Sequence, residues 1–175
     1  MSSKIDLRSV VTEHVKTLRN NRTDKISKID LLTFYGLPFV AGIVCVWFKL
    51  VLSTKAVGIL IGALSILAGL LINVLVLLFT VNSVGPTETE KAKQTKLIIE
   101  VNSNLLYAVL IAVVSIIALC IAPLIPETIY AKGRGEFLAG AAFSGFIIAL
   151  IGNFVLTLLM ALKRLKILLE LRFIG

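Results

Sequence analysis

The sequence predicts an all-α, polytopic membrane protein with four transmembrane helices. Hydrophobic residues make up 58% of 175 positions, whereas soluble domains are about 45–50% apolar. Four apolar runs each reach the roughly 20 residues that cross a bilayer as a helix, and none alternates apolar with polar residues as barrel strands do. The expected spans are residues 31–52, 56–81, 105–125 and 137–162.

The distribution of lysine and arginine predicts the orientation of these spans. Fourteen of the 18 basic residues lie in segments 1–30, 82–104 and 163–175. Cytoplasmic loops carry an excess of Lys and Arg, so both termini and the middle segment are expected in the cytoplasm, with 126–136 as an external loop. The net charge of +8 is explained by anionic lipid beside the spans, and direct nucleic-acid binding is not expected because no motif for it accompanies the charge.

Residues 1–30 predict a cytoplasmic amphipathic helix, because apolar residues recur at helical spacing between Leu7 and Leu18. Two interpretations are open for it. The helix either lies in the lipid headgroup layer or provides a docking surface for another cytoplasmic element.

The third and fourth helices are expected to extend beyond the membrane. In segment 82–104, Gly85-Pro86 predicts a turn and Thr87-x-x-Glu90 matches a capping box. No further Gly or Pro follows until Pro123, so the third helix is expected to run unbroken into the membrane. The fourth continues as a cytoplasmic amphipathic tail over 163–175.

Charged residues on these two extensions are candidates for docking a soluble cytoplasmic protein partner. Neighbouring acidic and basic residues on a helix surface stabilise the helix by only about 0.2–0.5 kcal/mol per pair. They therefore keep an extension solvated and do not attach it to the bundle. The candidate docking residues are Glu90, Lys93, Lys96, Glu100, Lys163, Arg164 and Lys166.

Small and weakly polar residues recur at steps of three or four in the last three spans. Such faces let helix backbones approach closely, and Asn can bond across helices. They predict helix packing, within one bundle or between subunits; alternatively, Ser65, Asn73 and Asn153 border a gated pathway in an oligomer. The residues are Gly58, Gly62, Ser65, Gly69, Asn73, Ser115, Gly145, Gly152 and Asn153.

The first span carries an interruption near its cytoplasmic end. Pro38 removes a backbone donor and disfavours helix at the residue before it, so a bend is expected around Gly36 and Pro38. Lys49 lies near the outer end, where its stem can snorkel to the interface.

Catalytic chemistry is not expected from this sequence. No ionisable residue lies deep in a span, which argues against a coupled transporter because such residues mark ion and proton pathways. His14 is the only histidine and is expected on the helix surface, while Cys45 and Cys120 are expected as small core residues. No nucleophile–base pair or metal cluster can be assembled, so neither a cofactor nor a metal is expected.

A charged N-terminal helix ending at "KIDLLTFYGLP", four spans and one charged middle segment define the layout. In this layout the chain resembles the small four-span membrane proteins of bacterial antiphage systems, such as the membrane subunit of Kiwa, the effectors of cyclic-oligonucleotide systems and the membrane accessories of some CRISPR loci. The chain contains no diagnostic motif of these families, so no functional residue can be transferred from them. The resemblance implies a multi-pass inner-membrane protein that works with a cytoplasmic sensor, with loss of membrane integrity or partner assembly as its output.

These observations lead us to expect a non-enzymatic, homo-oligomeric inner-membrane effector or scaffold that couples a cytoplasmic partner to the membrane, with a gated pore as one output. Its expected partners are membrane lipid, further copies of itself and a soluble protein. The alternatives are a passive channel or transporter for a small solute, and a structural subunit of a larger membrane complex.

Overall fold

The computed structural model describes residues 7–17, 32–80, 88–124 and 134–174, and all regular structure in these ranges is helical. This confirms the all-α class. The elements are α1 (Leu7–Thr17), the π-helical η1 (Leu32–Gly36), α3 (Leu37–Trp47), α4 (Thr54–Phe79), α5 (Glu88–Ile121), the 3-10 helical η2 (Ala122–Leu124) and α7 (Arg134–Ile174).

Three of the described helices are long and apolar enough to cross a membrane. Their apolar stretches are Thr54–Phe79, Lys91–Leu124 and Ala139–Glu170. The segment Leu32–Trp47 is apolar but shorter, spanning about 24 Å against a hydrocarbon core of about 30 Å. The helix ends at Trp47 instead of near residue 52 because the chain turns at Lys49, whose φ is 54°. The structure thus supports three to four spans.

α5 and α7 extend well beyond the thickness of a bilayer. They are continuous over 34 and 41 residues, which corresponds to about 51 and 61 Å. This confirms the unbroken helices expected from the lack of Gly and Pro in both extensions. α5 begins at Glu88, directly after the predicted cap Thr87, which lies outside the described residues. α7 begins at Arg134, inside the expected external loop.

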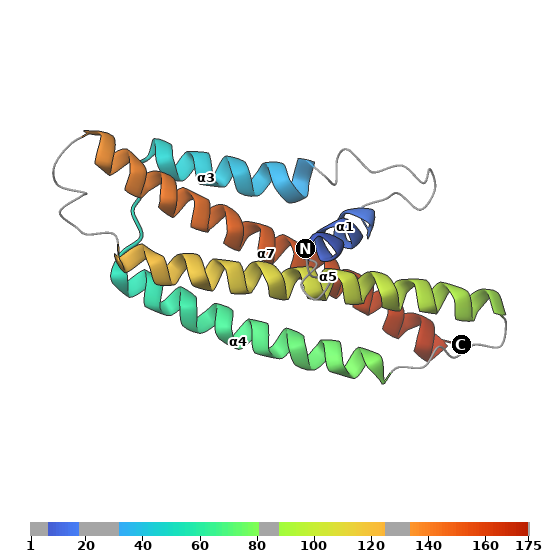
Figure 1. Cartoon of the computed structure of the whole chain (residues 1–175). Helices are drawn as coiled ribbons and strands as arrows, with labels where there is room; N and C mark the ends of the chain where they lie inside the picture. The colour runs from blue at the N-terminus through green and yellow to red at the C-terminus, as the bar shows by residue number, and fades with distance from the viewer. Residues whose placement is uncertain (1–6, 18–31, 81–87, 125–133, 175) are drawn as a thin grey trace.

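The helices α3, α7, α5 and α4 lie in a row, each packed on the next (Figure 1). α3 and α4 are consecutive in the chain but occupy opposite edges of this row. The connection between them, residues 48–53, crosses one end of the row, which we call the far end. α1 packs on α5 around the middle of that helix. We call the end of the row where α5 begins and α7 ends, on the other side from the far end, the α1 end.

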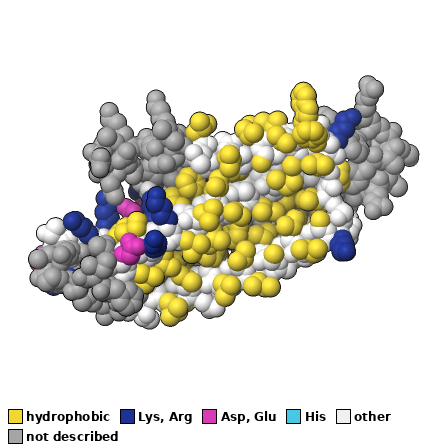
Figure 2. All heavy atoms as spheres, turned by 180° about the vertical axis from the view of Figure 1, so that it is seen from behind, with side chains coloured by type: hydrophobic (Ala, Val, Ile, Leu, Met, Phe, Trp, Pro, Cys, Tyr) yellow, Lys and Arg dark blue, Asp and Glu magenta, His cyan; other side chains and the backbone are white. Residues whose placement is uncertain are grey.

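The core follows the contacts between neighbouring helices. α4 faces α5 with apolar side chains at steps of three, four and seven residues, so one face of α4 is buried. These residues are Val57, Leu64, Ala68, Leu71 and Leu78. On the face that Figure 2 shows, hydrophobic side chains cover the middle, basic side chains lie at both ends, and acidic side chains are visible at the α1 end. An apolar belt between charged ends is the surface expected of a membrane-embedded bundle.

Candidate functional site at the α1 junction

α1 is attached to the bundle by its polar side chains. His14 and Thr17 are the buried residues of this helix, whereas Leu7 and Val11 are 53% and 39% exposed. His14 is fully buried, so its predicted surface position is wrong. We call the cluster around these side chains the α1 junction; it consists of His14, Thr17, Glu100, Asn104, Tyr107 and Arg164.

A three-way hydrogen-bond arrangement joins α1 to α5. Asn104 Oδ1 lies 2.9 Å from His14 Nδ1 and 2.8 Å from Thr17 Oγ1. An amide oxygen can only accept, so the neutral imidazole donates from Nδ1. His14 Nε2 and Asn104 Nδ2 are buried and have no hydrogen-bond partner in the described structure.

The imidazole is also enclosed by aromatic rings. The His14 ring stacks on Tyr107, with centroids 3.8 Å apart and planes 3° from parallel, and it meets Phe34 edge-on at 6.5 Å. The pKa of His14 is lowered to about 4, mainly because the ring is buried; the Asn104 hydrogen bond opposes this shift and the nearby Arg164 charge adds to it. His14 is therefore neutral at pH 7.

Arg164 connects three helices at this position. Its Nη1 lies 3.0 Å from Glu100 Oε2, and the two side chains are only 16% and 18% exposed. Its Nη2 donates to the backbone carbonyl of Thr17, the last residue of α1. The final carbonyls of a helix lack intrahelical donors and carry partial negative charge, so a cation from α7 caps the end of α1.

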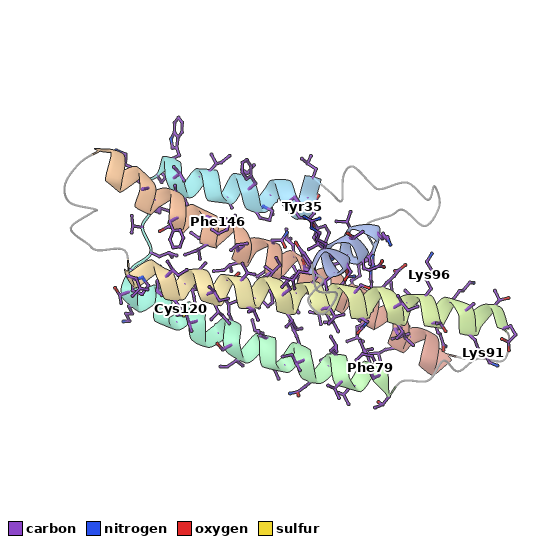
Figure 3. All side chains as sticks on the ribbon, in the orientation of Figure 1. Tyr35, Phe79, Lys91, Lys96, Cys120 and Phe146 are labelled. Carbon is purple, nitrogen blue, oxygen red and sulfur yellow. The ribbon has the colours of Figure 1, made fainter. Side chains whose placement is uncertain are left out.

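The structure separates the predicted docking residues into two groups. Glu100 and Arg164 pair with each other inside the junction, while Lys93, Lys96, Lys163 and Lys166 are exposed. The side chain of Glu90 lies outside the described residues. Figure 3 shows Lys91 and Lys96 projecting from the α1 end of α5.

A groove of about 520 Å³ lies between α1 and α5 beside the junction. Charges of both signs line it, from Glu13 and Lys16 on α1 and from Lys96 and Glu100 on α5. Lys96 and Glu100 were predicted from the sequence as docking residues on the extension of the third helix. The sequence did not predict that α1 forms the opposite wall of the groove.

The small-residue face of α4 meets no other helix among the described residues. All five of its residues are exposed, and a Cβ added at any of its three glycines would meet nothing within 4 Å. The packing of α4 on α5 uses another face, which consists mostly of Leu and Val side chains. The residues of this outward face are Gly58, Gly62, Ser65, Gly69 and Asn73.

The small residues of α5 and α7, in contrast, lie at helix contacts. Ser115 is fully buried and donates to the Ile111 carbonyl at 2.7 Å. A Cβ at Gly145 would lie 2.6 Å from the carbonyl oxygen of Gly42, and one at Gly152 would lie 3.4 Å from Pro38 Cβ. α3 therefore approaches α7 backbone to backbone.

Asn153 compensates for the proline of the first span. Pro38 has no N–H for the carbonyl four residues earlier, that of Phe34, and Asn153 Nδ2 donates to this oxygen at 3.0 Å. The chain forms the π-helical turn η1 at this place, where the sequence predicts a bend. A side chain from a neighbouring helix is a usual way to satisfy a backbone group freed by proline in a membrane.

Within the described ranges, no group of three or more His, Cys, Asp or Glu side chains is placed to hold a metal ion. No protein-family model, curated protein or solved structure matches the chain.

Proposed function

We propose that this chain is a non-enzymatic, homo-oligomeric membrane effector or scaffold that couples a soluble cytoplasmic partner to its membrane-spanning helices. In this proposal α3 is the first of four spans, and α1, the start of α5 and the end of α7 lie in the cytoplasm. The observation that carries the proposal is the α1 junction, because it ties the three cytoplasmic segments together through buried polar contacts.

The junction lies where charged helix surface gives way to apolar helix surface. Asn104 immediately precedes the third expected span, and Arg164 lies two residues after the end of the fourth. A partner that moves α1 must break or distort the contacts of Thr17 with both of these residues. Such a partner can shift the equilibrium between docked and released α1 only by the difference between its affinities for these two states.

The groove between α1 and α5 supports a protein as the partner. Its mixed charges suit complementary ion pairs across an interface, which favour specificity and rapid association. Exposed Lys93 and Lys96 extend this surface along α5. The exposed Leu7 and Val11 suit contact with the headgroup layer, so α1 would lie between lipid and partner.

The outward face of α4 supports assembly of several copies. Three glycines at steps of four and seven residues leave a flat helix surface, and Asn73 adds a polar group to it. In lipid, close packing of small residues and hydrogen bonds between asparagines drive helix association. In a ring of copies Ser65 and Asn73 would face the adjoining subunit or a pathway between subunits.

The test of assembly is mass measurement of the protein in mild detergent. Gly62→Leu with Gly69→Leu is expected to reduce the assembly to monomers, because leucine prevents close approach of two α4 helices. The matched control, Ala63→Leu, alters an exposed residue on a neighbouring face of α4 and should keep the assembly. A strictly monomeric native protein would refute the oligomer.

The test of coupling is capture of a partner on the detergent-solubilised protein, combined with a membrane-potential dye in cells. Lys93→Glu with Lys96→Glu should reduce both partner capture and depolarisation, whereas Lys55→Glu at the far end should change neither. Solute flux in liposomes that contain this protein alone would instead favour the passive channel. The antiphage role is supported by the resemblance in layout, and it predicts that depolarisation follows phage infection.

A further inference from the structure

A second groove, the lateral groove, lies between α3 and α7 toward the far end. Its volume is about 520 Å³, within the roughly 300–1,000 Å³ of ligand pockets. Of the described residues that line it, Lys49 alone is charged, and the others are apolar side chains or glycines. This groove is separate from the α1 junction.

The close approach of two glycines creates the lateral groove. Gly42 and Gly145 place no side chain on its floor, and their backbones are in contact. Phe39 and Trp47 on α3 and Phe146 on α7 form its walls; Phe146 is labelled in Figure 3. These three side chains are 66%, 81% and 53% exposed, so the groove opens sideways onto the apolar belt, where the surroundings are hydrocarbon.

Lys49 lies at the end of this groove in an unusual backbone conformation. α3 ends with the hydrogen bonds Lys49 N to Val46 O at 3.0 Å and Leu50 N to Cys45 O at 2.9 Å. These two bonds form a Schellman motif, whose left-handed position glycine usually occupies. Here that position is Lys49, with φ at 54°. Strained positions of this kind cluster at ligand sites.

We propose that the lateral groove binds one acyl chain of an anionic phospholipid whose phosphate pairs with the ammonium group of Lys49. The apolar floor and walls suit hydrocarbon, and a basic residue at one end of the groove suits a phosphate. An apolar groove with a basic residue at one end matches an anionic lipid better than it matches another apolar helix. This inference needs α3 and α7 to lie in the membrane, but it is independent of the oligomer and of the cytoplasmic partner.

The experiment is native mass measurement of the full-length protein after delipidation and exposure to phosphatidylglycerol or phosphatidylcholine with identical acyl chains. The native protein should retain phosphatidylglycerol at least about tenfold better, the ratio that 1.4 kcal/mol produces. Lys49→Gln should lose this preference, and its control Lys55→Gln, an exposed lysine at the same end, should keep it. Ala142→Leu fills the groove from an exposed position and should lower retention of both lipids, unlike Ala63→Leu on α4.

A measurement on the native protein does not depend on any variant being folded. Phosphatidylglycerol with a photoreactive group in its acyl chain should label peptides from residues 37–47 and 139–150. Labelling spread evenly over α4 and α5 as well would overturn the proposal, as would equal retention of the two lipids by the native protein. If Ala142→Leu instead separated copies of the chain without changing lipid retention, the groove would be a subunit contact and the proposal would be wrong.

Discussion

The imidazole of His14 and the side-chain amide of Asn104, 90 residues apart in the chain, meet through a 2.9 Å hydrogen bond that joins α1 to α5. The amide oxygen accepts from His14 Nδ1, so the ring can take up a second proton only at Nε2. That nitrogen is buried without a partner, and Arg164 is close enough to lower the pKa of the ring. The docking of α1 therefore requires a neutral histidine.

We expect α1 to dock less firmly as the pH falls from about 6.5 to about 4. The pKa of His14 is about 4 when docked and returns toward 6.5 when α1 is released, so the released state binds a proton first. The stabilisation is complete above the released pKa and is lost as the pH falls toward the docked pKa, to a limit of about 3 kcal/mol. The mobility of a spin label at Thr12→Cys, an exposed position, measures this release.

His14→Phe is the control for this pH dependence. A phenyl ring can keep the stacking on Tyr107, and Thr17 can still donate to Asn104, but the titrating group is gone. The label mobility of this variant should be flat over the same pH range. An unchanged pH response in His14→Phe would show that another group controls α1.

The helices themselves could largely be predicted from the sequence because their causes are local. A continuous apolar run and the absence of Gly and Pro decide the course of α5 over 34 residues, and no distant contact is needed. The end of α3 is different. A Schellman turn normally shows itself by a glycine, but here the left-handed residue is Lys49, so the sequence offers no marker that the helix stops at Trp47.

The contacts between helices could not be predicted, because one pattern can have two outcomes. Gly145 and Gly69 both belong to small-residue faces, yet Gly145 contacts a neighbouring backbone while Gly69 faces outward. The difference depends on the order of helices in the row. The three-residue spacing of His14 and Thr17 could have indicated a polar face on α1, but their acceptor Asn104 lies far away in the chain.

Asn153→Leu should lower the free energy of unfolding by about 1–2 kcal/mol, because the part-buried Phe34 carbonyl loses the donor that Asn153 provides. Unfolding in mixed detergent micelles measures this change. Asn73→Leu is the control, since Asn73 is exposed on α4 and its replacement should cost little within one chain. Equal losses in the two variants would contradict the role of Asn153.

Pro38→Ala tests whether the missing N–H of Pro38 is the reason that Asn153 stabilises the fold through the Phe34 carbonyl. Alanine restores the backbone N–H that the Phe34 carbonyl lacks, so Asn153→Leu should be less costly in the Pro38→Ala background. A double-mutant cycle measures the difference, and contacting residues typically couple by about 0.5–3 kcal/mol. Strict additivity would show that Asn153 does not act through the proline.

Gly145→Ala should destabilise the chain by about 1–3 kcal/mol, the usual range for overpacking. The new Cβ would lie 2.6 Å from the Gly42 carbonyl oxygen, which is backbone and can move only if α3 moves. Gly69→Ala is the matched change on α4, where the Cβ meets nothing within 4 Å. In a detergent that keeps the chain monomeric, it should be neutral or stabilising by up to about 1 kcal/mol, because alanine favours helix. The same unfolding assay measures both variants, and a stable Gly145→Ala protein would contradict the close approach of α3 and α7.

Lys49→Gly should raise the free energy of unfolding by about 1 kcal/mol, because glycine adopts a left-handed conformation without the steric cost that a Cβ imposes. Lys55→Gly gives the opposite expectation, since Lys55 lies in the first turn of α4 and glycine in a helix costs about 1 kcal/mol. If the lateral groove holds an anionic lipid, Lys49→Gly separates two properties that usually change together, giving a delipidated protein that is more stable and retains less phosphatidylglycerol. A loss of stability in delipidated Lys49→Gly would mean that the lysine side chain stabilises the fold by more than its backbone conformation costs.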